Sequence, residues 1–165
     1  MRTLETPALT VAPEMARPED VARIAQLLEH GAPETIVLSL EEIEERLDRF
    51  LVLRTPSGTV VAAAALHPID ENSTELRSVA VDPDWRGHGL GRRIVRYALA
   101  CVVGADRELF CYTFRPGFFR SVGFHDTASS SLPERGDRPS ELDGRPRRTM
   151  SATADSMSPS TWDDE

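Results

Sequence analysis

The feature of this 165-residue chain that most limits its fold is a glycine-rich segment between an apolar strand and a helix. Residues 79–100 read VAVDPDWRGHGLGRRIVRYALA, in which an Asp-Pro pair ends the apolar run and glycines follow at positions 87, 89 and 91. A helical pattern begins directly afterwards. It places Leu90, Ile94, Tyr97, Ala98 and Cys101 on one side, expected to be buried, and Arg92, Arg93 and Arg96 on the other. Glycine lets another molecule approach the backbone closely, and the start of a helix presents unpaired N–H groups. The segment therefore predicts an anion-binding loop.

Three kinds of phosphate-binding loop have this strand–glycine–helix order, and two of them fit poorly. A Walker loop ends in Gly-Lys-Ser/Thr, but all nineteen basic residues of this chain are arginine. The dinucleotide-binding pattern spaces its glycines as G-x-G-x-x-G early in a strand–helix–strand unit. Here the spacing is G-x-G-x-G, and a series of predicted strands precedes it. The remaining pattern is Arg-x-x-Gly-x-Gly, which Arg86, Gly89 and Gly91 satisfy.

The rest of the chain predicts one domain of helices and strands around this loop. Helical spacing of apolar residues begins at Val21, and Ser39 with Glu42 forms a capping-box pattern for a second helix that also includes Leu47. Apolar runs between turn residues predict strands at 8–15, 50–55, 59–69, 74–82 and 108–114, a short helix at 115–123 and a further strand at 146–153. The domain is placed at 8–153, and residues 154–165 are predicted to be a disordered acidic tail.

Charge and composition narrow the classes of function. A net charge of −8 disfavours nucleic-acid binding, which depends on clustered positive charge. No apolar run has the length of a membrane span and the N-terminus lacks a signal-peptide pattern, so no membrane partner and a cytoplasmic location are expected. Cys101 and Cys111 lie in apolar segments and are expected to be reduced core residues. The histidines show no ligand spacing with cysteines or carboxylates, so no metal site is predicted.

Two motifs in this order resemble the GNAT superfamily of N-acetyltransferases. ELRSVAVDPDWRGHGLGRRIV is similar to the acetyl-CoA signature of that family, and PGFFRSVGF is similar to its later helix and strand. The resemblance covers about residues 9–125. It implies the GNAT fold, an α/β (α+β) architecture with a mixed, mostly antiparallel sheet flanked by helices. Within the superfamily the chain is most similar to the amino-acid N-acetyltransferases, a group that includes N-acetylglutamate synthases.

The resemblance implies a role for each part of the glycine segment in binding acetyl-CoA. The strand before the loop holds the pantetheine arm through its backbone at Val79, Ala80 and Val81. Peptide N–H groups of the loop bind the pyrophosphate at Gly87, His88, Gly89, Leu90 and Gly91. Three side chains can add charge-assisted contacts to the phosphates, namely Arg86, Arg92 and Arg93. The side chain of His88 itself is expected to be exposed to solvent.

Acetyl transfer to an amine requires a base, because amines are mostly protonated near neutral pH. GNAT enzymes often place a glutamate on the strand before the loop, where it acts through water, and Glu75 is the candidate here. Its alternatives are a surface acid or an ion-pair partner of Arg77. Strict alternation would place both residues on the face of Val79 and Val81. By the same resemblance, the N–H of Val79 is a donor to the developing oxyanion.

The acid that assists the departing thiolate is a point where the sequence leaves the family pattern. Many GNAT members carry a tyrosine in the helix before GF, and this chain has Phe119 there. Phenylalanine cannot donate a proton, so Tyr112 is the candidate acid. A buried core role for Tyr112, with unassisted departure of the thiolate, is the alternative.

The expected acceptor is a primary amine of a small molecule, such as the amino acid glutamate. Arginines that could bind an acceptor carboxylate in a bidentate manner, or instead form structural ion pairs, are Arg77, Arg115, Arg145, Arg147 and Arg148. A protein N-terminus as the acceptor and a non-catalytic acetyl-CoA-binding role are the alternatives. The sequence leaves a homodimer open.

Overall fold

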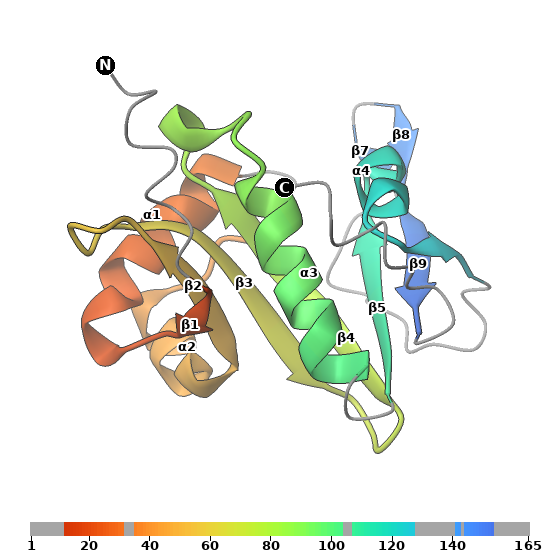
Figure 1. The fold of residues 1–165 in the computed structure, drawn as a ribbon, viewed down its shortest axis with the longest axis horizontal. Helices are drawn as coiled ribbons and strands as arrows, with labels where there is room; N and C mark the ends of the chain where they lie inside the picture. Colours follow the sequence, from red (N-terminus) through yellow and green to blue (C-terminus); the bar gives the residue numbers. More distant parts are fainter. Residues whose placement is uncertain (1–11, 32–34, 104–106, 128–140, 143, 154–165) are drawn as a thin grey trace. The chain divides into compact units, whose positions relative to one another are not determined.

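The computed structural model describes residues 12–31, 35–103, 107–127, 141–142 and 144–153. Within these residues, seven strands form one mixed sheet in the order β1-β2-β3-β4-β5-β9-β6, and β7 pairs with β8 (Figure 1). β4 and β5 are parallel, whereas β1/β2, β2/β3, β5/β9 and β6/β9 are antiparallel. This mixed sheet confirms the predicted fold class. The chain divides into a first unit, Met1–His67 with Leu76–Ala98, and a second unit, Pro68–Glu75 with Leu99–Glu165.

The first unit contains the glycine segment and the strands that lead to it. Its strands are β1 (Glu14–Met15), β2 (Phe50–Arg54), nearly all of β3 (Val60–Pro68) and the later part of β4 (Ser73–Val81). Its helices are α1 (Val21–Gly31), α2 (Leu40–Glu45) and the first part of α3 (Leu90–Val103), with short 3-10 turns η3 (Pro18–Asp20), η4 (Leu47–Arg49) and η5 (Pro83–Trp85). Of the first predicted strand, 8–15, residues 8–11 lie outside the described residues.

α1 and α2 form where the sequence predicts them. The apolar residues of α1 recur at helical spacing and are buried, namely Val21, Ile24, Leu27 and Leu28. Ser39 Oγ accepts a hydrogen bond from the Glu42 N–H at 3.1 Å, and the Glu42 carboxylate accepts one from the Ser39 N–H at 2.9 Å. These two bonds complete the predicted capping box. Leu47, predicted on this helix, lies beyond its end in η4.

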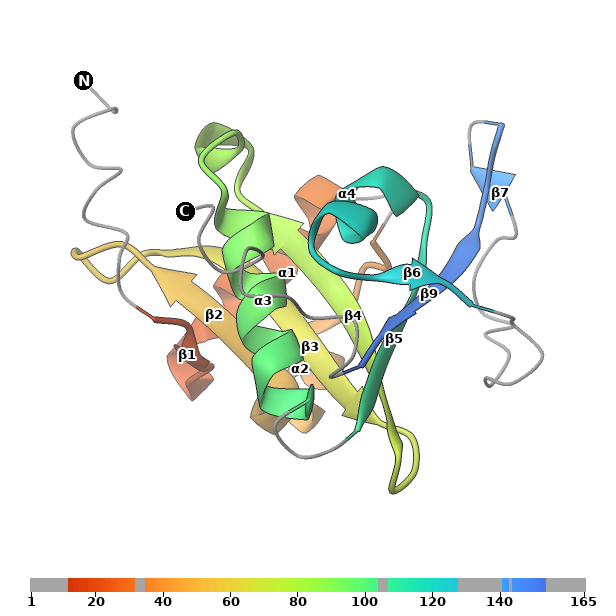
Figure 2. The same ribbon diagram turned by 45° about the vertical axis from the view of Figure 1, so that its right-hand side comes forward.

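The core of the first unit lies on both faces of β2 and β3. Phe50 pairs with Ala65 and Val52 with Ala63, and these four residues belong to one buried cluster with the apolar side chains of α1 and α2. The alternate residues of the same strands are also buried, namely Leu51, Leu53, Ala62 and Ala64. They lie on the opposite face, where Figures 1 and 2 show α3 running in front of the strands. The sheet of this unit is therefore covered on both sides.

The second unit contains β5 (Glu108–Thr113), α4 (Pro116–Ser121), β6 (His125–Asp126), β7 (Glu141–Leu142), β8 (Arg145–Pro146) and β9 (Arg148–Ala152), together with the start of β4. β5 is buried from Leu109 to Thr113 because it pairs on both sides, with β4 and with β9. β9 confirms the strand predicted at 146–153. Phe119 of α4 packs edge to face on Phe118 and Phe124, with ring centroids 4.9 and 5.3 Å apart.

The buried face of α3 differs from the predicted one. Arg96, predicted on the exposed side, is 3% exposed, whereas Tyr97, predicted on the buried side, is 37% exposed. Cys111 is buried as expected, but the prediction of a core position for Cys101 is wrong because that residue is exposed. The cause is that α3 carries a second apolar stripe, Val95, Leu99 and Val102, and this stripe is buried.

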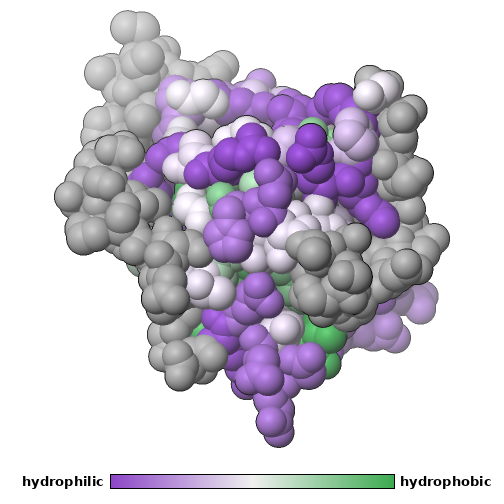
Figure 3. Space-filling model, turned by 90° about the vertical axis from the view of Figure 1, so that its right-hand side faces the viewer, coloured by the Kyte–Doolittle hydropathy of each residue, from purple (hydrophilic) through white to green (hydrophobic). Residues whose placement is uncertain are grey.

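One face of the described surface is mostly polar (Figure 3). Figure 3 shows hydrophilic side chains over most of the described part of one face, with hydrophobic ones in small areas between them. No helix in this part of the chain combines the length and hydropathy needed to cross a membrane. The predicted acidic tail, 154–165, lies outside the described residues.

Candidate active site

The glycine segment leaves β4 through a short turn that Asp82 organises. The Asp82 N–H donates to the carbonyl of Val61 at 2.8 Å. The Asp82 carboxylate accepts the N–H of Asp84 at 2.8 Å, and the Asp82 carbonyl accepts the N–H of Trp85 at 2.9 Å. An aspartate that bonds to the backbone two residues later is a standard way to begin such a turn. The direction in which the chain enters the loop is therefore fixed at Asp82.

Glycine is required at two positions of the loop. The backbone is in the left-handed region at Gly87, with φ of 85°, and at Gly89, with φ of 77°. Side chains are disfavoured in this region. A Cβ added at Gly87 would meet no atom within 4 Å, so the space beside this residue is open. The Gly89 carbonyl accepts the N–H of Arg93 at 3.0 Å, and α3 begins at Leu90. The loop thus ends at the N-terminus of a 14-residue helix, where unpaired N–H groups favour an anion.

The side chains of the loop divide into packed residues and arginines that solvent can reach. Leu90 is buried, and Trp85 packs edge to face on His88 with ring centroids 6.1 Å apart. Because of this packing His88 is half-buried, and the prediction of a solvent-exposed side chain is wrong to that extent. Arg86 is exposed, and Arg92 is half-buried.

The backbone of β4 is irregular at Ser78, immediately before the residues predicted to hold pantetheine. Ser78 has a φ of 57° and is the one non-glycine residue with positive φ in the described part of the chain. A left-handed residue breaks the two-residue alternation of a strand. The prediction of one shared face is therefore wrong beyond Ser78. Val79 and Val81 do not continue the face of Glu75 and Arg77. After this residue, Ala80 is buried while Val79 and Val81 are half-buried.

Glu75 lies in the second unit, on the part of β4 that pairs with β5. It stands opposite Phe110, and its side chain is 1% exposed. The alternative of a surface acid is therefore wrong. Phe110 in turn pairs with Ser151 of β9, and Ser151 pairs with His125 of β6. Because paired residues lie on the same face of a sheet, these four side chains form one row across β4, β5, β9 and β6.

Tyr112 lies on the same face as Glu75. It follows Phe110 by two residues on β5, and the two rings meet edge to face with centroids 5.7 Å apart. Two residues of a strand span about 6.6 Å, so the candidate acid stands roughly one such step beyond the row of the candidate base. Tyr112 is 7% exposed, and the guanidinium carbon of Arg147 lies 5.2 Å from its ring centroid. This distance is typical of a cation–π contact.

Arginines gather in the second unit where β5 ends and β9 begins. Arg145 Nη1 donates to the carbonyl of Phe114 at 3.4 Å, and Arg147 lies over Tyr112. Arg148 and Arg120 both pair with Asp126, at 3.5 and 3.0 Å, and are half-exposed. The ion pair of Arg148 agrees with the structural role that the sequence left open for these arginines. Of the other two candidates, Arg115 is exposed before α4, and Arg77 is half-buried on β4 in the first unit.

One residue with a direct link to the loop was missed by sequence reasoning. Arg23 of α1 forms an ion pair with Asp82 and donates to the carbonyl of Val60 at 2.8 Å. In the sequence it is only a polar position on the exposed side of an amphipathic helix, so spacing alone gave no signal for it.

The matching family model and three relatives of this chain are all described as acetyltransferases. Residues 46–126 match the family described as the acetyltransferase (GNAT) domain. An amino-acid acetyltransferase of Mycobacterium tuberculosis is 37% identical over 115 residues, which are 66% of this chain and 65% of that protein. An uncharacterized N-acetyltransferase of Chlorobaculum tepidum is 30% identical over 132 residues, 78% of this chain and 84% of the relative. The chain spans only 27% of a Vibrio vulnificus amino-acid acetyltransferase that is 28% identical.

Solved structures show the same fold. The crystal structure of Rv2747 from Mycobacterium tuberculosis, determined in complex with CoA, has a TM-score of 0.73 at 26% identity and covers 87% of this chain and 99% of its own. N-acetylglutamate synthase from Neisseria gonorrhoeae, in complex with coenzyme A and N-acetyl-glutamate, has a TM-score of 0.73 at 24% identity. It covers 86% of this chain, which corresponds to 34% of the synthase.

Proposed function

Because this chain belongs to the GNAT family of acetyltransferases, we propose that it transfers the acetyl group of acetyl-CoA to the primary amine of a small molecule, an amino acid such as glutamate. The observation that carries the proposal is the loop from Arg86 to Arg92. It combines two left-handed glycines with the N-terminus of α3 and with arginine side chains. The names of the amino-acid acetyltransferase relatives support the choice of acceptor.

The first step of the proposal is diphosphate binding by the first unit. The open space beside Gly87 and the bare backbone at Gly89 and Gly91 suit close approach of phosphate oxygens. Peptide N–H groups from Gly87 to Gly91, including those of His88 and Leu90, are the proposed donors. Arg86 and Arg92 are proposed to add charge-assisted contacts. The chain residues that would hold the pantetheine arm are Val79, Ala80 and Val81, through their backbone.

Glu75 is the proposed general base. Its burial favours a role inside a site over one at the surface, because buried carboxylates are rare without a specific purpose. It would accept a proton from the acceptor ammonium, through water. The neutral amine then attacks the thioester carbonyl, and the N–H of Val79 donates to the oxygen on which negative charge develops.

Tyr112 is the proposed acid that donates a proton to the departing thiolate. Its place on the face of Glu75 supports this role, and so does the presence of Phe119 where family members carry tyrosine. The same burial would also suit a purely structural tyrosine. Replacement by phenylalanine separates the two roles, because Tyr112→Phe keeps the ring under Arg147 and removes only the hydroxyl.

Arg147 and Arg145 are the proposed partners of the acceptor carboxylate. Both lie near the end of β5 that carries Tyr112, and a guanidinium can hold a carboxylate with two parallel hydrogen bonds. An amino acid bound there would be recognised by its negative charge. A polyamine or a peptide N-terminus would not be.

The proposal is tested by following thiol release from acetyl-CoA with glutamate, other amino acids and short peptides as acceptors. Glu75→Gln is expected to lower kcat by about 10²-fold or more while the Kd for CoA stays within about twofold, since general base catalysis is worth 10²–10⁴-fold. Glu71→Gln, in the exposed loop before β4, is the matched control and should retain full activity. Equal activity of Glu75→Gln and Glu71→Gln would remove Glu75 from the mechanism.

A second candidate function is acetyl-CoA binding without catalysis. The observation that favours it is Phe119, which is buried against Phe118 and Phe124 and cannot act as an acid. Binding of CoA together with no thiol release across the whole acceptor panel would favour this function over acetyl transfer.

A further inference from the structure

Arg23 connects three parts of the first unit through one guanidinium. Its Nε donates to the carbonyl of Val60 at 2.8 Å, at the start of β3, and its Nη1 donates to Gln26 Oε1 at 2.7 Å, on α1. Its Nη2 donates to Asp82 Oδ2, at the end of β4. The three nitrogens thus point to a helix, a strand and the first residue after β4.

The partner of Arg23, Asp82, also holds the entry to the glycine loop. One carboxylate oxygen of Asp82 faces Arg23 and the other accepts the Asp84 N–H. The two side chains are largely buried, with 24% of Arg23 and 15% of Asp82 exposed. Burial by itself would raise the pKa of Asp82, but the hydrogen bonds from Asp84 and Arg23 outweigh it and hold the pKa below its ordinary value. The pair is therefore charged near neutral pH.

We propose that Arg23 is a positioning residue for the diphosphate of the acyl donor, acting through Asp82 on the glycine loop. The inference rests on the proposed function and extends it to a residue on α1. Glycines give the loop freedom that must be removed before its N–H groups can point together at an anion. Between Asp82 and Gly87 there are only four residues, three of which form η5, so a fixed Asp82 fixes where the first left-handed glycine stands.

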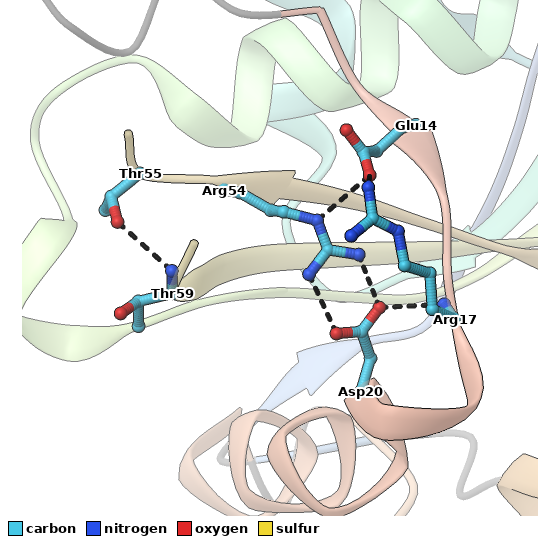
Figure 4. Close-up of polar contacts among 6 residues, drawn as sticks. All are labelled: Glu14, Arg17, Asp20, Arg54, Thr55 and Thr59. Atoms are coloured by element: carbon cyan, nitrogen blue, oxygen red, sulfur yellow. Dashed lines mark hydrogen bonds and ion pairs between the residues drawn. The ribbon is translucent and has the colours of Figure 1, made fainter. Parts of the chain in front are cut away.

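The contacts of Arg23 separate this role from general stabilisation of α1. The helix is already held by its buried side chains, including Ile24, Leu27 and Leu28. A second ion-pair network of the same unit joins Arg54 to Asp20 and Glu14, and its bonds fix the turn before α1 instead of the entry to the glycine loop (Figure 4). Loss of Arg23 should therefore loosen the loop, whereas loss of Arg54 should only destabilise the unit.

The test compares Arg23→Gln with Arg54→Gln as the matched control, using two acyl donors. S-acetylpantetheine lacks the diphosphate. Loss of a residue that positions the diphosphate loop should therefore change kcat/KM for this donor little. For Arg23→Gln we expect the Kd for CoA and the KM for acetyl-CoA to rise about tenfold, the effect of one lost charge-assisted hydrogen bond. The kcat with acetyl-CoA and the kcat/KM with S-acetylpantetheine should both stay within about twofold of the wild-type values. Arg23→Lys, which keeps the charge but cannot contact Val60 and Asp82 together, should recover part of the loss.

Each outcome supports or overturns the inference. Equal losses with both donors, or unchanged CoA affinity in Arg23→Gln, would overturn it. A larger loss of CoA affinity in Arg54→Gln than in Arg23→Gln would overturn it as well. If circular dichroism shows that Arg23→Gln does not fold, Asp82→Asn takes its place. Asparagine can still accept the Asp84 N–H but lacks the charge that faces Arg23. An unchanged Kd of Asp82→Asn for CoA would then overturn the inference. A native protein that does not bind CoA would instead refute the proposed function, and the inference with it.

Discussion

At the scale of single residues, Ser78 is the position where the backbone of β4 departs most from a regular strand. Its φ of 57° places a residue with a side chain in the left-handed region. This conformation costs an L-residue roughly 1–2 kcal/mol relative to the right-handed regions, and glycine pays little of this cost. The strain lies between Glu75, the proposed base, and Val79, the proposed oxyanion donor. Such strain persists where the surrounding structure imposes it.

Substitutions at Ser78 should therefore follow backbone strain and not side-chain size. Ser78→Gly is expected to leave the free energy of unfolding unchanged or to raise it by up to about 1 kcal/mol. Ser78→Val is expected to lower it by about 2 kcal/mol, because a β-branched side chain is least tolerated at positive φ. Urea unfolding measures both, with Ser73→Val at the start of the same strand as the control. A Ser78→Val protein as stable as Ser73→Val would contradict the left-handed assignment.

At the scale of elements, an ion-pair network joins β1, η3 and β2. Arg54 donates to Asp20 at 2.8 and 2.6 Å and to Glu14 at 3.0 Å, and the Arg17 N–H donates to Asp20 at 2.8 Å (Figure 4). The side chains of Asp20 and Arg54 are 5% and 11% exposed. The hydrogen bond from Arg54 is the main cause of a lowered pKa at Asp20, against which burial acts, and the Arg17 N–H lowers the pKa further. The network thus fixes the turn from which α1 starts.

This network predicts a specific acid sensitivity. A carboxyl whose pKa is lower in the folded than in the unfolded protein stabilises the fold above its unfolded pKa, and this contribution is lost as the pH falls through the folded value. Asp20→Asn should thus reduce stability at pH 7 by about 2 kcal/mol. It should also flatten the loss of stability below about pH 4, the ordinary range of an aspartate. Thermal unfolding from pH 7 to pH 3 measures this, with Glu19→Gln as the control, because Glu19 lies in the same turn but is exposed. Parallel pH curves for the wild type and Asp20→Asn would refute the role of Asp20.

The elements also show why sequence reasoning succeeded in some places and failed in others. The capping box at Ser39 and the glycine loop before α3 depend on local chemistry, so their positions were predictable. The buried face of α3 was not, because two apolar stripes compete and only packing selects between them. Ser78 was missed because nothing in its residue type distinguishes a left-handed serine from an extended one. Arg23 was missed because its partner is 59 residues away in the chain.

At the scale of the whole molecule, the fold and the family followed from two ordered motifs, whereas the roles of Glu75 and Tyr112 remain proposals. The strand register brings these two side chains onto one face of the second unit, which spacing in the sequence could not have shown. A cytoplasmic location remains a prediction of the sequence, and the sequence leaves a homodimer open. The claim on which the others depend is that the loop from Arg86 to Arg92 binds the diphosphate of coenzyme A.

Two glycines allow a direct test of this claim. Gly87 and Gly58 have similar positive φ, 85° and 96°, and a Cβ at either would meet no atom within 4 Å. Alanine should therefore strain both positions alike, by roughly 1 kcal/mol, although only Gly87 lies in the loop.

The decisive measurement is calorimetric titration of CoA into the wild type, Gly58→Ala and Gly87→Ala. The account predicts saturable binding to the wild type, the same affinity within about twofold for Gly58→Ala, and at least about tenfold weaker binding to Gly87→Ala. No binding to the wild type, or equal affinity of all three proteins, would contradict it.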